Sequence, residues 1–268
     1  MTHDGYGSFG AHAAHYGMAR REFPNDIFVY LKKRCRQRAT VLDIGCGTGI
    51  PSRQLADHGF KVTGSDRDKR MIEQAKDDSK KDAVGYITAP SGALPFGNAS
   101  FEIITAFSAF HWFCDDEASI SEIKRVLKDA GLLFIVNKNE TGAMKKIIKS
   151  TLERFASDAL PKDAKAAYKP VQILKENGFS DIEEYTVPVV EKYTVDEAIL
   201  YAQSMSVWNL IERNRHPETL SALRNVFISN AKEGFVLRPL NVTAVSGFYS
   251  LRNACCLRPG HYSGTVPE

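Results

Sequence analysis

The sequence has no long apolar run and little excess charge of either sign. No stretch approaches the ~18 consecutive apolar residues of a membrane-spanning helix, and the N-terminus has no apolar signal-peptide core. The formal net charge is only +3 over 268 residues, which disfavours a dedicated nucleic-acid binder. Internal repeats and low-complexity segments are also lacking. These absences favour an ordinary globular protein over a membrane or fibrous one.

Cysteine is scarce and irregularly spaced, which excludes the usual cysteine-built sites. The five cysteines form neither a metal-cluster pattern nor a disulfide framework: Cys35, Cys46, Cys114, Cys255 and Cys256. We therefore expect no metal site and a reducing, cytoplasmic location. The length suits one large α/β domain with insertions, as a monomer or a homodimer.

The most informative stretch runs from residue 41 to residue 52. An apolar run at residues 40–44 predicts a buried strand, and a helix is expected to follow from Ser52. Between them, Gly45, Gly47 and Gly49 stand at every second position, where glycine permits positive φ angles and close approach of the backbone to a ligand. Strand, loop and helix start together predict a site whose backbone N–H groups point at an anionic or polar ligand.

The residues around this loop favour S-adenosylmethionine over a nicotinamide cofactor. A dinucleotide fingerprint needs a glycine where Ile50 stands. Asp43 comes two residues before the first glycine and can bind an ammonium group. Asp66 ends the next apolar run and is placed to accept hydrogen bonds from two ribose hydroxyls. In the alternative interpretation Asp43 caps the loop and Asp66 caps the next helix, although Asp68 is already present for that cap.

The first half of the chain alternates between predicted strands and helices. Strands are expected at residues 40–44, 61–65, 86–88, 100–107 and 132–137, and helices at residues 25–36, 53–58, 68–77 and 117–127. Asn25 is the expected cap of the first helix. This alternation predicts an α/β fold with a Rossmann-like, doubly wound and mostly parallel sheet, whose ligands bind at the carboxyl ends of the strands.

The second half is less regular and predicts a helical cap followed by the last strands. One helix or two are expected over residues 142–160, and further helices at residues 168–177, 195–208 and 217–231. Strands are expected at residues 182–190 and 240–249, which completes a seven-stranded sheet. We expect a single domain over residues 1–250, with an N-terminal lid at 1–25, a cofactor-binding core at 26–140, and the substrate cap with the last strands at 141–250. Residues 251–268 are expected to be a loose tail.

Further segments accompany the glycine motif. Leu-Pro-Phe follows the third predicted strand at residues 94–96, Ser-Ala-Phe-His-Trp-Phe follows the fourth at 108–113, and Tyr16-x-x-x-Arg20-x-x-Phe23-Pro24 precedes the core. Together these segments resemble the class I S-adenosylmethionine-dependent methyltransferases of type 11, in particular their trans-aconitate methyltransferase-like branch. The resemblance covers roughly residues 9–140.

The resemblance implies roles for individual residues. Tyr16 and Arg20 would belong to a segment that folds over the cofactor, with Arg20 on its carboxylate. Asp43 and the three glycines would hold the methionine part, and Asp66 the ribose. Expected near the adenine are Arg67, Met71, Ala93 and Leu94; expected near the methionine part and the transferred methyl group are Phe107 and His111. Pro90 stands where many relatives have an acid for the adenine amino group, so the Ser91 hydroxyl or a backbone carbonyl would take that role.

Four residues are candidates for contact with the methyl acceptor: Trp112, Asn139, Tyr201 and Trp208. Tyr201 and Trp208 also fit the core of a cap, and a His111–Trp112 pair also fits core packing. If His111 lies in the site, it either positions the acceptor or acts as a general base.

The predicted function is methyl transfer from S-adenosylmethionine to a small molecule, and the trans-aconitate comparison suggests a carboxylate as acceptor. A carboxylate is already ionised at neutral pH and needs no general base, whereas a phenol, an amine or a carbon acid could use His111. The alternatives are an RNA or other macromolecule methyltransferase, a non-catalytic S-adenosylmethionine-binding protein, and a nicotinamide oxidoreductase. The basic run at residues 32–38 is the candidate RNA footprint, but it equally suits a helix C-terminus. The low net charge makes nucleic acid a disfavoured partner.

Overall fold

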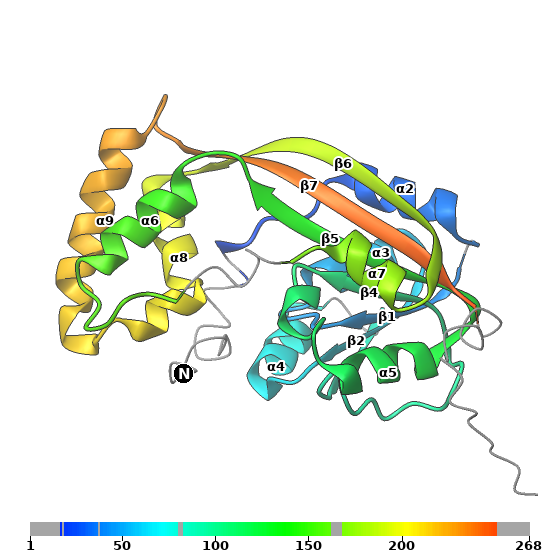
Figure 1. Ribbon diagram of the computed structural model, residues 1–268. Coiled ribbons are helices and arrows are strands. Elements are labelled where there is room, and N and C mark those ends of the chain that lie inside the picture. The colour runs from blue at the N-terminus through cyan, green and yellow to red at the C-terminus, as the bar shows by residue number, and fades with distance from the viewer. Residues whose placement is uncertain (1–16, 18, 37, 80–82, 162–167, 251–268) are drawn as a thin grey trace, which may run out of the picture.

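A computed structural model describes residues 17, 19–36, 38–79, 83–161 and 168–250. At its centre is a seven-stranded sheet with the order β3-β2-β1-β4-β5-β7-β6 (Figure 1). The strands are β1 Thr40–Ile44, β2 Lys61–Asp66, β3 Val84–Thr88, β4 Phe101–Phe107, β5 Leu127–Glu140, β6 Phe179–Tyr193 and β7 Val236–Tyr249. Neighbouring strands from β3 to β5 are parallel, and β7 runs antiparallel to both β5 and β6. The predicted α/β fold with a seven-stranded, mostly parallel sheet is confirmed.

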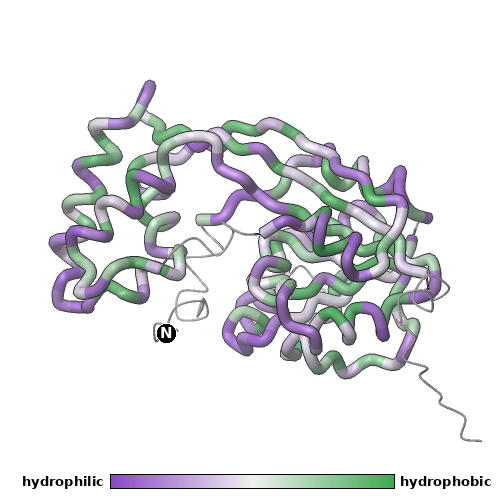
Figure 2. Tube along the Cα trace, viewed as in Figure 1, coloured by the Kyte–Doolittle hydropathy of each residue, from purple (hydrophilic) through white to green (hydrophobic). Residues whose placement is uncertain are grey.

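Helices cover both faces of this sheet because each has one apolar side. On one face lie α2 Asn25–Arg34, α3 Ile50–Asp57 and α4 Lys69–Asp77; on the other lie α5 Glu117–Val126 and α7 Pro170–Glu176. Burial is complete for Phe28 of α2 and Leu55 of α3, and nearly so for Ile123 of α5. Along the helices in Figure 2, hydrophobic (green) and hydrophilic (purple) stretches alternate. The apolar periodicity of the sequence therefore accounts for the layering.

The order of the strands determines where a ligand can bind. Successive strands step from β1 to β2 to β3 in one direction, and then from β1 to β4 to β5 in the other. The carboxyl ends of β1 and β4 consequently diverge into a crevice at the point where the order reverses. The loop after Ile44 and the segment after Phe107 lie at this crevice.

The cap is a separate cluster of helices at the far ends of the long strands. It consists of α6 Met144–Glu153, α8 Val195–Gln203 and α9 His216–Asn230, with short 3-10 helices at Ser206–Leu210 and Arg213–Arg215 (Figure 1). Its apolar core includes the fully buried side chains of Tyr193, Leu223 and Phe227. Since β5, β6 and β7 are 14, 15 and 14 residues long, they reach beyond the other strands and carry the cap.

Several predicted boundaries were wrong, for identifiable reasons. The first helix begins at Asn25 itself, with Pro24 in the cap position and no side-chain cap, and it ends at Arg34. The predicted helix over 142–160 ends at Glu153, and the predicted helix over 195–208 divides into α8 and a 3-10 helix. The strands at 182–190 and 240–249 are several residues longer than their apolar patterns, because their outer parts pair with each other beyond the core.

Among the described residues, no helix is long and apolar enough to cross a membrane. Cys35, Cys46 and Cys114 are free thiols. The location of the protein, its oligomeric state and its division into lid, core and cap stay predictions.

Candidate active site

The glycine loop between β1 and α3 adopts the backbone conformation that its sequence predicts. Gly45, Gly47 and Gly49 have φ angles of +67°, +55° and +75°. A Cβ on Gly45 would stand 2.7 Å from the Cβ of Ala109, so the loop also packs closely on the segment after β4. The Cys46 N–H donates to the Ser65 carbonyl at 3.0 Å, which fixes the loop to the end of β2.

Asp66 at the end of β2 connects the glycine loop with the next helix. One carboxylate oxygen accepts a hydrogen bond from the Gly47 N–H at 2.9 Å, and the other accepts from the Asp68 N–H at 2.9 Å. The Asp68 side chain caps α4 through the Arg70 N–H, so the cap role falls to Asp68 as expected. Burial raises the pKa of Asp66, and the two backbone donors partly oppose that shift. Asp66 lines a cavity, where its remaining lone pairs can accept hydrogen bonds from a ligand.

Two cavities meet at the glycine loop. The first, of about 470 Å³, lies over the ends of β2 and β3 and includes Asp66, Arg67, Met71 and residues 89–92. The second, of about 430 Å³, lies between the core and the cap. Both are lined by the same five residues at their junction: Gly45, Gly47, Phe107, Ser108 and Trp112. An elongated ligand can therefore lie across the loop with one end in each cavity.

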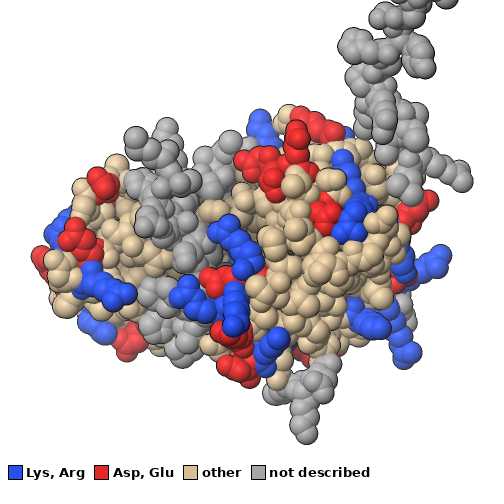
Figure 3. Space-filling view, turned by 90° about the horizontal axis from the view of Figure 1, so that it is seen from below, with Lys and Arg blue, Asp and Glu red and all other residues tan. Residues whose placement is uncertain are grey.

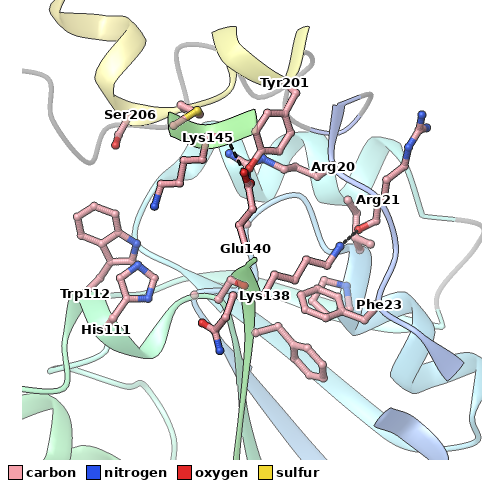
Figure 4. Close-up of a pocket in the computed structure, with 18 of the residues that line it drawn as sticks. Arg20, Arg21, Phe23, His111, Trp112, Lys138, Glu140, Lys145, Tyr201 and Ser206 are labelled. Carbon is pink, nitrogen blue, oxygen red and sulfur yellow. Dashed lines mark hydrogen bonds between the residues drawn. The ribbon is translucent and has the colours of Figure 1, made fainter. Parts of the chain in front are cut away.

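The cavity between core and cap brings together side chains from distant parts of the chain (Figure 4). His111 and Trp112 come from the short 3-10 helix after β4, with their ring centroids 5.1 Å apart. Asn139 comes from the end of β5, and Tyr201 from α8 of the cap. Of the predicted site residues, Arg20, Gly45, Gly47, Phe107, His111, Trp112, Asn139 and Tyr201 line this cavity.

A strap formed by residues 20–24 borders this cavity and connects the core to the cap. On the core side, the Gln54 side chain accepts from the Phe23 N–H at 3.0 Å and donates to the Phe23 carbonyl at 2.9 Å. The Lys138 ammonium donates to the Arg21 carbonyl at 2.7 Å and to the Glu22 carbonyl at 3.0 Å. On the cap side, the Arg20 guanidinium lies 4.5 Å from the ring centroid of Tyr201 and donates to Ser204. Its contact with a cofactor carboxylate stays a prediction, and Tyr16 lies outside the described residues.

Sequence reasoning missed a buried group of charged residues behind the strap. Glu191 accepts from Lys138 at 2.7 Å and from Arg238 at 2.8 Å, and Arg238 also pairs with Glu140 at 2.8 Å. Burial lowers the pKa of Lys138 to about 8, although Glu191 opposes the shift. Lys138 stands directly before Asn139 at the end of β5, so its position at a strand end could have identified it as a candidate site residue.

Asp43 lies in the interior and lines neither cavity, so its contact with the methionine part of a cofactor stays a prediction. The residue is 0% exposed, and its two oxygens accept hydrogen bonds from the Ser52 hydroxyl at 2.6 Å and from the Thr105 hydroxyl at 2.8 Å. It therefore holds β1, β4 and the first turn of α3 together under the glycine loop. Burial raises its pKa to about 7, against the lowering effect of the two hydroxyls.

Replacing Asp43 should therefore affect stability in a pH-dependent way. Because the folded-state pKa lies above the unfolded one, the stability that Asp43 contributes is largest near pH 4 and is lost as the pH rises to about 7. Wild-type protein should lose stability relative to Asp43→Asn between pH 5 and pH 8 in urea unfolding. Asp43→Ala should be destabilised at both pH values by on the order of 1–3 kcal/mol for each hydroxyl left unpaired. A pH-independent difference between wild type and Asp43→Asn would contradict the raised pKa.

Four other predicted site residues line neither cavity: Gly49, Ala93, Leu94 and Trp208. Leu94 is a core residue, 5% exposed, whose N–H donates to Glu122, and neither Ala93 nor Leu94 lines the first cavity. The wall of the first cavity beyond β3 is formed instead by four residues that come earlier in the chain: Ala89, Pro90, Ser91 and Gly92. Trp208 is 1% exposed in the core of the cap and lines neither cavity. Gly49 begins α3 and supports the loop from outside both cavity linings.

The described residues contain no cluster of His, Cys, Asp and Glu that could hold a metal ion. The site comprises the glycine loop, one carboxylate at the end of β2, and a cavity between core and cap that is lined largely by basic side chains.

Comparisons with known proteins agree with this geometry. A family model described as methyltransferase domain matches residues 42–135. An uncharacterized methyltransferase, YcgJ of Bacillus subtilis, is 34% identical over 38% of this chain and 42% of its own length. A malonyl-[acyl-carrier protein] O-methyltransferase of Erwinia pyrifoliae is 30% identical over 54% of this chain and 60% of its own length. The crystal structure of a putative type II methyltransferase from Anaeromyxobacter dehalogenans superposes with a TM-score of 0.60 and 21% identity over 85% of this chain and 96% of that one.

Proposed function

We propose that the chain transfers a methyl group from S-adenosylmethionine to a small molecule, since a family model described as methyltransferase domain matches residues 42–135. The supporting observation is the pair of cavities that meet at the glycine loop, one lined by Asp66 and the other lying between the core and the cap. Methyltransferase is the enzyme class, and S-adenosylmethionine is its cofactor.

The first cavity fits the nucleoside half of the cofactor. Asp66 would hold the ribose hydroxyls, while Arg67, Met71 and Ser91 line the wall available to the adenine. The Ser91 hydroxyl lies 2.8 Å from that of Ser119, so it has a polar neighbour that can orient it. The Gly45 and Gly47 backbone, with Arg20 across the cavity, would hold the methionine half.

The second cavity would hold the methyl acceptor. When bound, S-adenosylmethionine supplies a methyl group whose carbon bonds to the acceptor as its bond to sulfur breaks and the electron pair passes to sulfur. The protein aligns the acceptor and excludes water, which in favourable cases lowers the barrier by about 7–11 kcal/mol. Residues of the strap and the cap line the cavity in which this alignment would take place. A carboxylate acceptor needs no base, which leaves His111 to orient it; an acceptor with a proton to lose would use His111 as the base.

We further propose that the chain belongs to the trans-aconitate methyltransferase-like branch, which its sequence motifs resemble. The relative from Erwinia pyrifoliae is named a malonyl-[acyl-carrier protein] O-methyltransferase, which supports oxygen as the methylated atom. The size of the cavity between core and cap, about 430 Å³, supports a small acceptor more than an RNA.

Titration of the protein with S-adenosylhomocysteine and, separately, with NADH tests the cofactor assignment. We expect saturable binding of S-adenosylhomocysteine with a Kd on the order of micromolar and no measurable heat with NADH. Transfer of tritiated methyl groups should then be found with pooled small metabolites and not with bulk RNA. Binding of NADH alone would overturn the cofactor, and labelling of RNA alone would overturn the small-molecule acceptor.

A further inference from the structure

The Lys138 ammonium joins the strap to the long strands of the sheet. It donates to the Arg21 carbonyl at 2.7 Å and to the Glu22 carbonyl at 3.0 Å. Its third acceptor is the Glu191 carboxylate of β6, also at 2.7 Å. An ammonium group has three donors, so these acceptors use all of them. In Figure 4 the Lys138 side chain extends from β5 toward the strap, and a dashed line marks its bond to Arg21. Lys138 therefore holds two successive carbonyls of the strap in a fixed position relative to the sheet.

The same ammonium lies against the Phe23 ring, which connects it with the junction of the two cavities. The Lys138 Nζ atom is 4.6 Å from the ring centroid of Phe23, within the range of a cation–π contact. Phe23 packs edge-to-face on Phe107, with ring centroids 4.9 Å apart. Phe107 lines both cavities. Because packed side chains transmit small displacements, a shift of the strap would move the wall beside which the two halves of an elongated ligand meet.

Glu191 lies behind Lys138 and keeps it in place. Glu191 is 7% exposed, and its second carboxylate oxygen accepts from Arg238 at 2.8 Å and from the Tyr193 hydroxyl at 2.7 Å. Glu191 and Arg238 are direct neighbours across the pairing of β6 with β7. Burial lowers the pKa of Lys138 to about 8, and the charge of Glu191 opposes that shift. Without this carboxylate the pKa of Lys138 would lie lower still, and its charged form would be lost at a lower pH.

The charged groups around Lys138 have both signs. Among the described residues, it interacts with Glu191 of β6, Arg238 of β7 and Arg20 of the strap. Arg238 also pairs with Glu140 at 2.8 Å. Figure 3 shows Lys and Arg side chains beside Asp and Glu side chains where the cap meets the core. These pairings indicate a role in holding the strap in place.

We propose that Lys138 is a positioning residue for cofactor binding: held by Glu191, it fixes the strap and the contact between Phe23 and Phe107 that borders both cavities. Lys138 acts through the strap and needs no contact of its own with the cofactor. The inference rests on the proposed methyltransferase function and adds a residue to the same site.

Three variants test this role: Lys138→Met, Glu191→Gln and the matched control Lys192→Met. Lys192 is exposed, stands directly after Glu191 and lines neither cavity. In calorimetric titration with S-adenosylhomocysteine at pH 7, we expect Lys138→Met to weaken binding at least about tenfold, Glu191→Gln at least about threefold, and Lys192→Met less than about twofold. If Lys138 only attracted the cofactor carboxylate, Glu191→Gln would remove a nearby negative charge and strengthen binding. Weaker binding by Glu191→Gln therefore separates positioning from attraction.

The pH dependence of the affinity separates this role from a merely structural one. Since protonated Lys138 holds the strap, wild-type affinity should fall as the pH rises through the Lys138 pKa of about 8. The fall should occur at lower pH in Glu191→Gln and should be unchanged in Lys192→Met. Titration of the cofactor itself is common to all the proteins, and Lys138→Met should show only that contribution.

Trypsin cleavage after Arg20 and Arg21 reports the state of the strap without any cofactor. The mass of the released N-terminal fragment identifies the cleaved bond, and far-UV circular dichroism confirms that each variant is folded. We expect cleavage at least about tenfold faster in Lys138→Met than in wild type, because local opening of the strap exposes these bonds, and the wild-type rate in Lys192→Met.

Equal cleavage rates in wild type and Lys138→Met, identical pH profiles of these two proteins, or tighter binding by Glu191→Gln would each overturn the proposal. If Lys138→Met does not fold, the affinity and pH profile of Glu191→Gln decide. Absence of S-adenosylhomocysteine binding by the wild type would overturn the proposed function, whereas the cleavage rates would still show whether Lys138 holds the strap.

Discussion

Replacing Asp66 with alanine is expected to weaken binding of S-adenosylhomocysteine by at least about 100-fold. Asp66 lines the first cavity at the end of β2, where its carboxylate can accept hydrogen bonds from both ribose hydroxyls. Hydrogen bonds to a charged acceptor contribute about 1.5–3 kcal/mol each, so losing two of them accounts for the expected change. The variant also removes the acceptor for the Gly47 N–H, which loosens the loop on which the methionine half would lie.

Two controls separate the loss of ribose contacts from a general disturbance of the fold. Asp66→Asn keeps the size and one carbonyl oxygen, so it should bind with intermediate affinity. Asp68→Ala removes the cap of α4 and leaves the Asp66 carboxylate in place, so it should lower stability with less than about tenfold loss of affinity. Calorimetric titration gives the affinities, and far-UV circular dichroism confirms that each variant is folded. Binding by Asp66→Ala within about threefold of wild type would remove this residue from the cofactor site.

Asp66 and Asp43 show what the sequence can and cannot predict about a site. Both carboxylates belong to parallel strands that end at the same edge of the sheet. Asp66 is the last residue of β2, and that position is enough to predict its exposure to the crevice. Asp43 lies one residue inside β1, and its burial depends on Ser52 and Thr105, which are 9 and 62 residues away in the chain. Partners that are so far apart in the chain leave no local sequence pattern from which the contact could be predicted.

The fold, too, has parts that local sequence patterns predict and parts that depend on contacts between distant residues. The core was predictable because each strand, loop and helix carries its own signal over fewer than about 15 residues. The cap was predictable as helices, but its core was not: burial of Trp208 depends on packing against residues of α9 such as His216, 4.7 Å away between ring centroids. The basic cavity joins Arg20, Lys138, Lys149 and Arg238 from four separate elements. Single-sequence reasoning places such residues on faces and strand ends, and only the tertiary structure brings them together.

Among substitutions that add a single methyl group near the site, we expect Gly49→Ala to cause the largest loss of stability and of cofactor binding. Gly49 has a φ angle of +75°, and a Cβ there would overlap the hydroxyl of Tyr86 and lie 2.8 Å from its Cζ atom. The Tyr86 ring is 8% exposed in the core, so it cannot move aside freely. The left-handed backbone costs about 1–2 kcal/mol and the overlap about 1–3 kcal/mol more. Since Gly49 also begins α3, the loop must shift, and we expect affinity for S-adenosylhomocysteine to fall at least about tenfold.

Gly59→Ala is the matched control for this substitution. Gly59 has a φ angle of +88°, and a Cβ there would meet nothing within 4 Å. It should lose only the backbone contribution of about 1–2 kcal/mol in urea unfolding and bind S-adenosylhomocysteine as wild type does. If the overlap with Tyr86 is the cause, the double variant Gly49→Ala/Tyr86→Ala should lose less stability than the sum of its two single variants. Equal losses in Gly49→Ala and Gly59→Ala would show that the contact with Tyr86 does not constrain the loop.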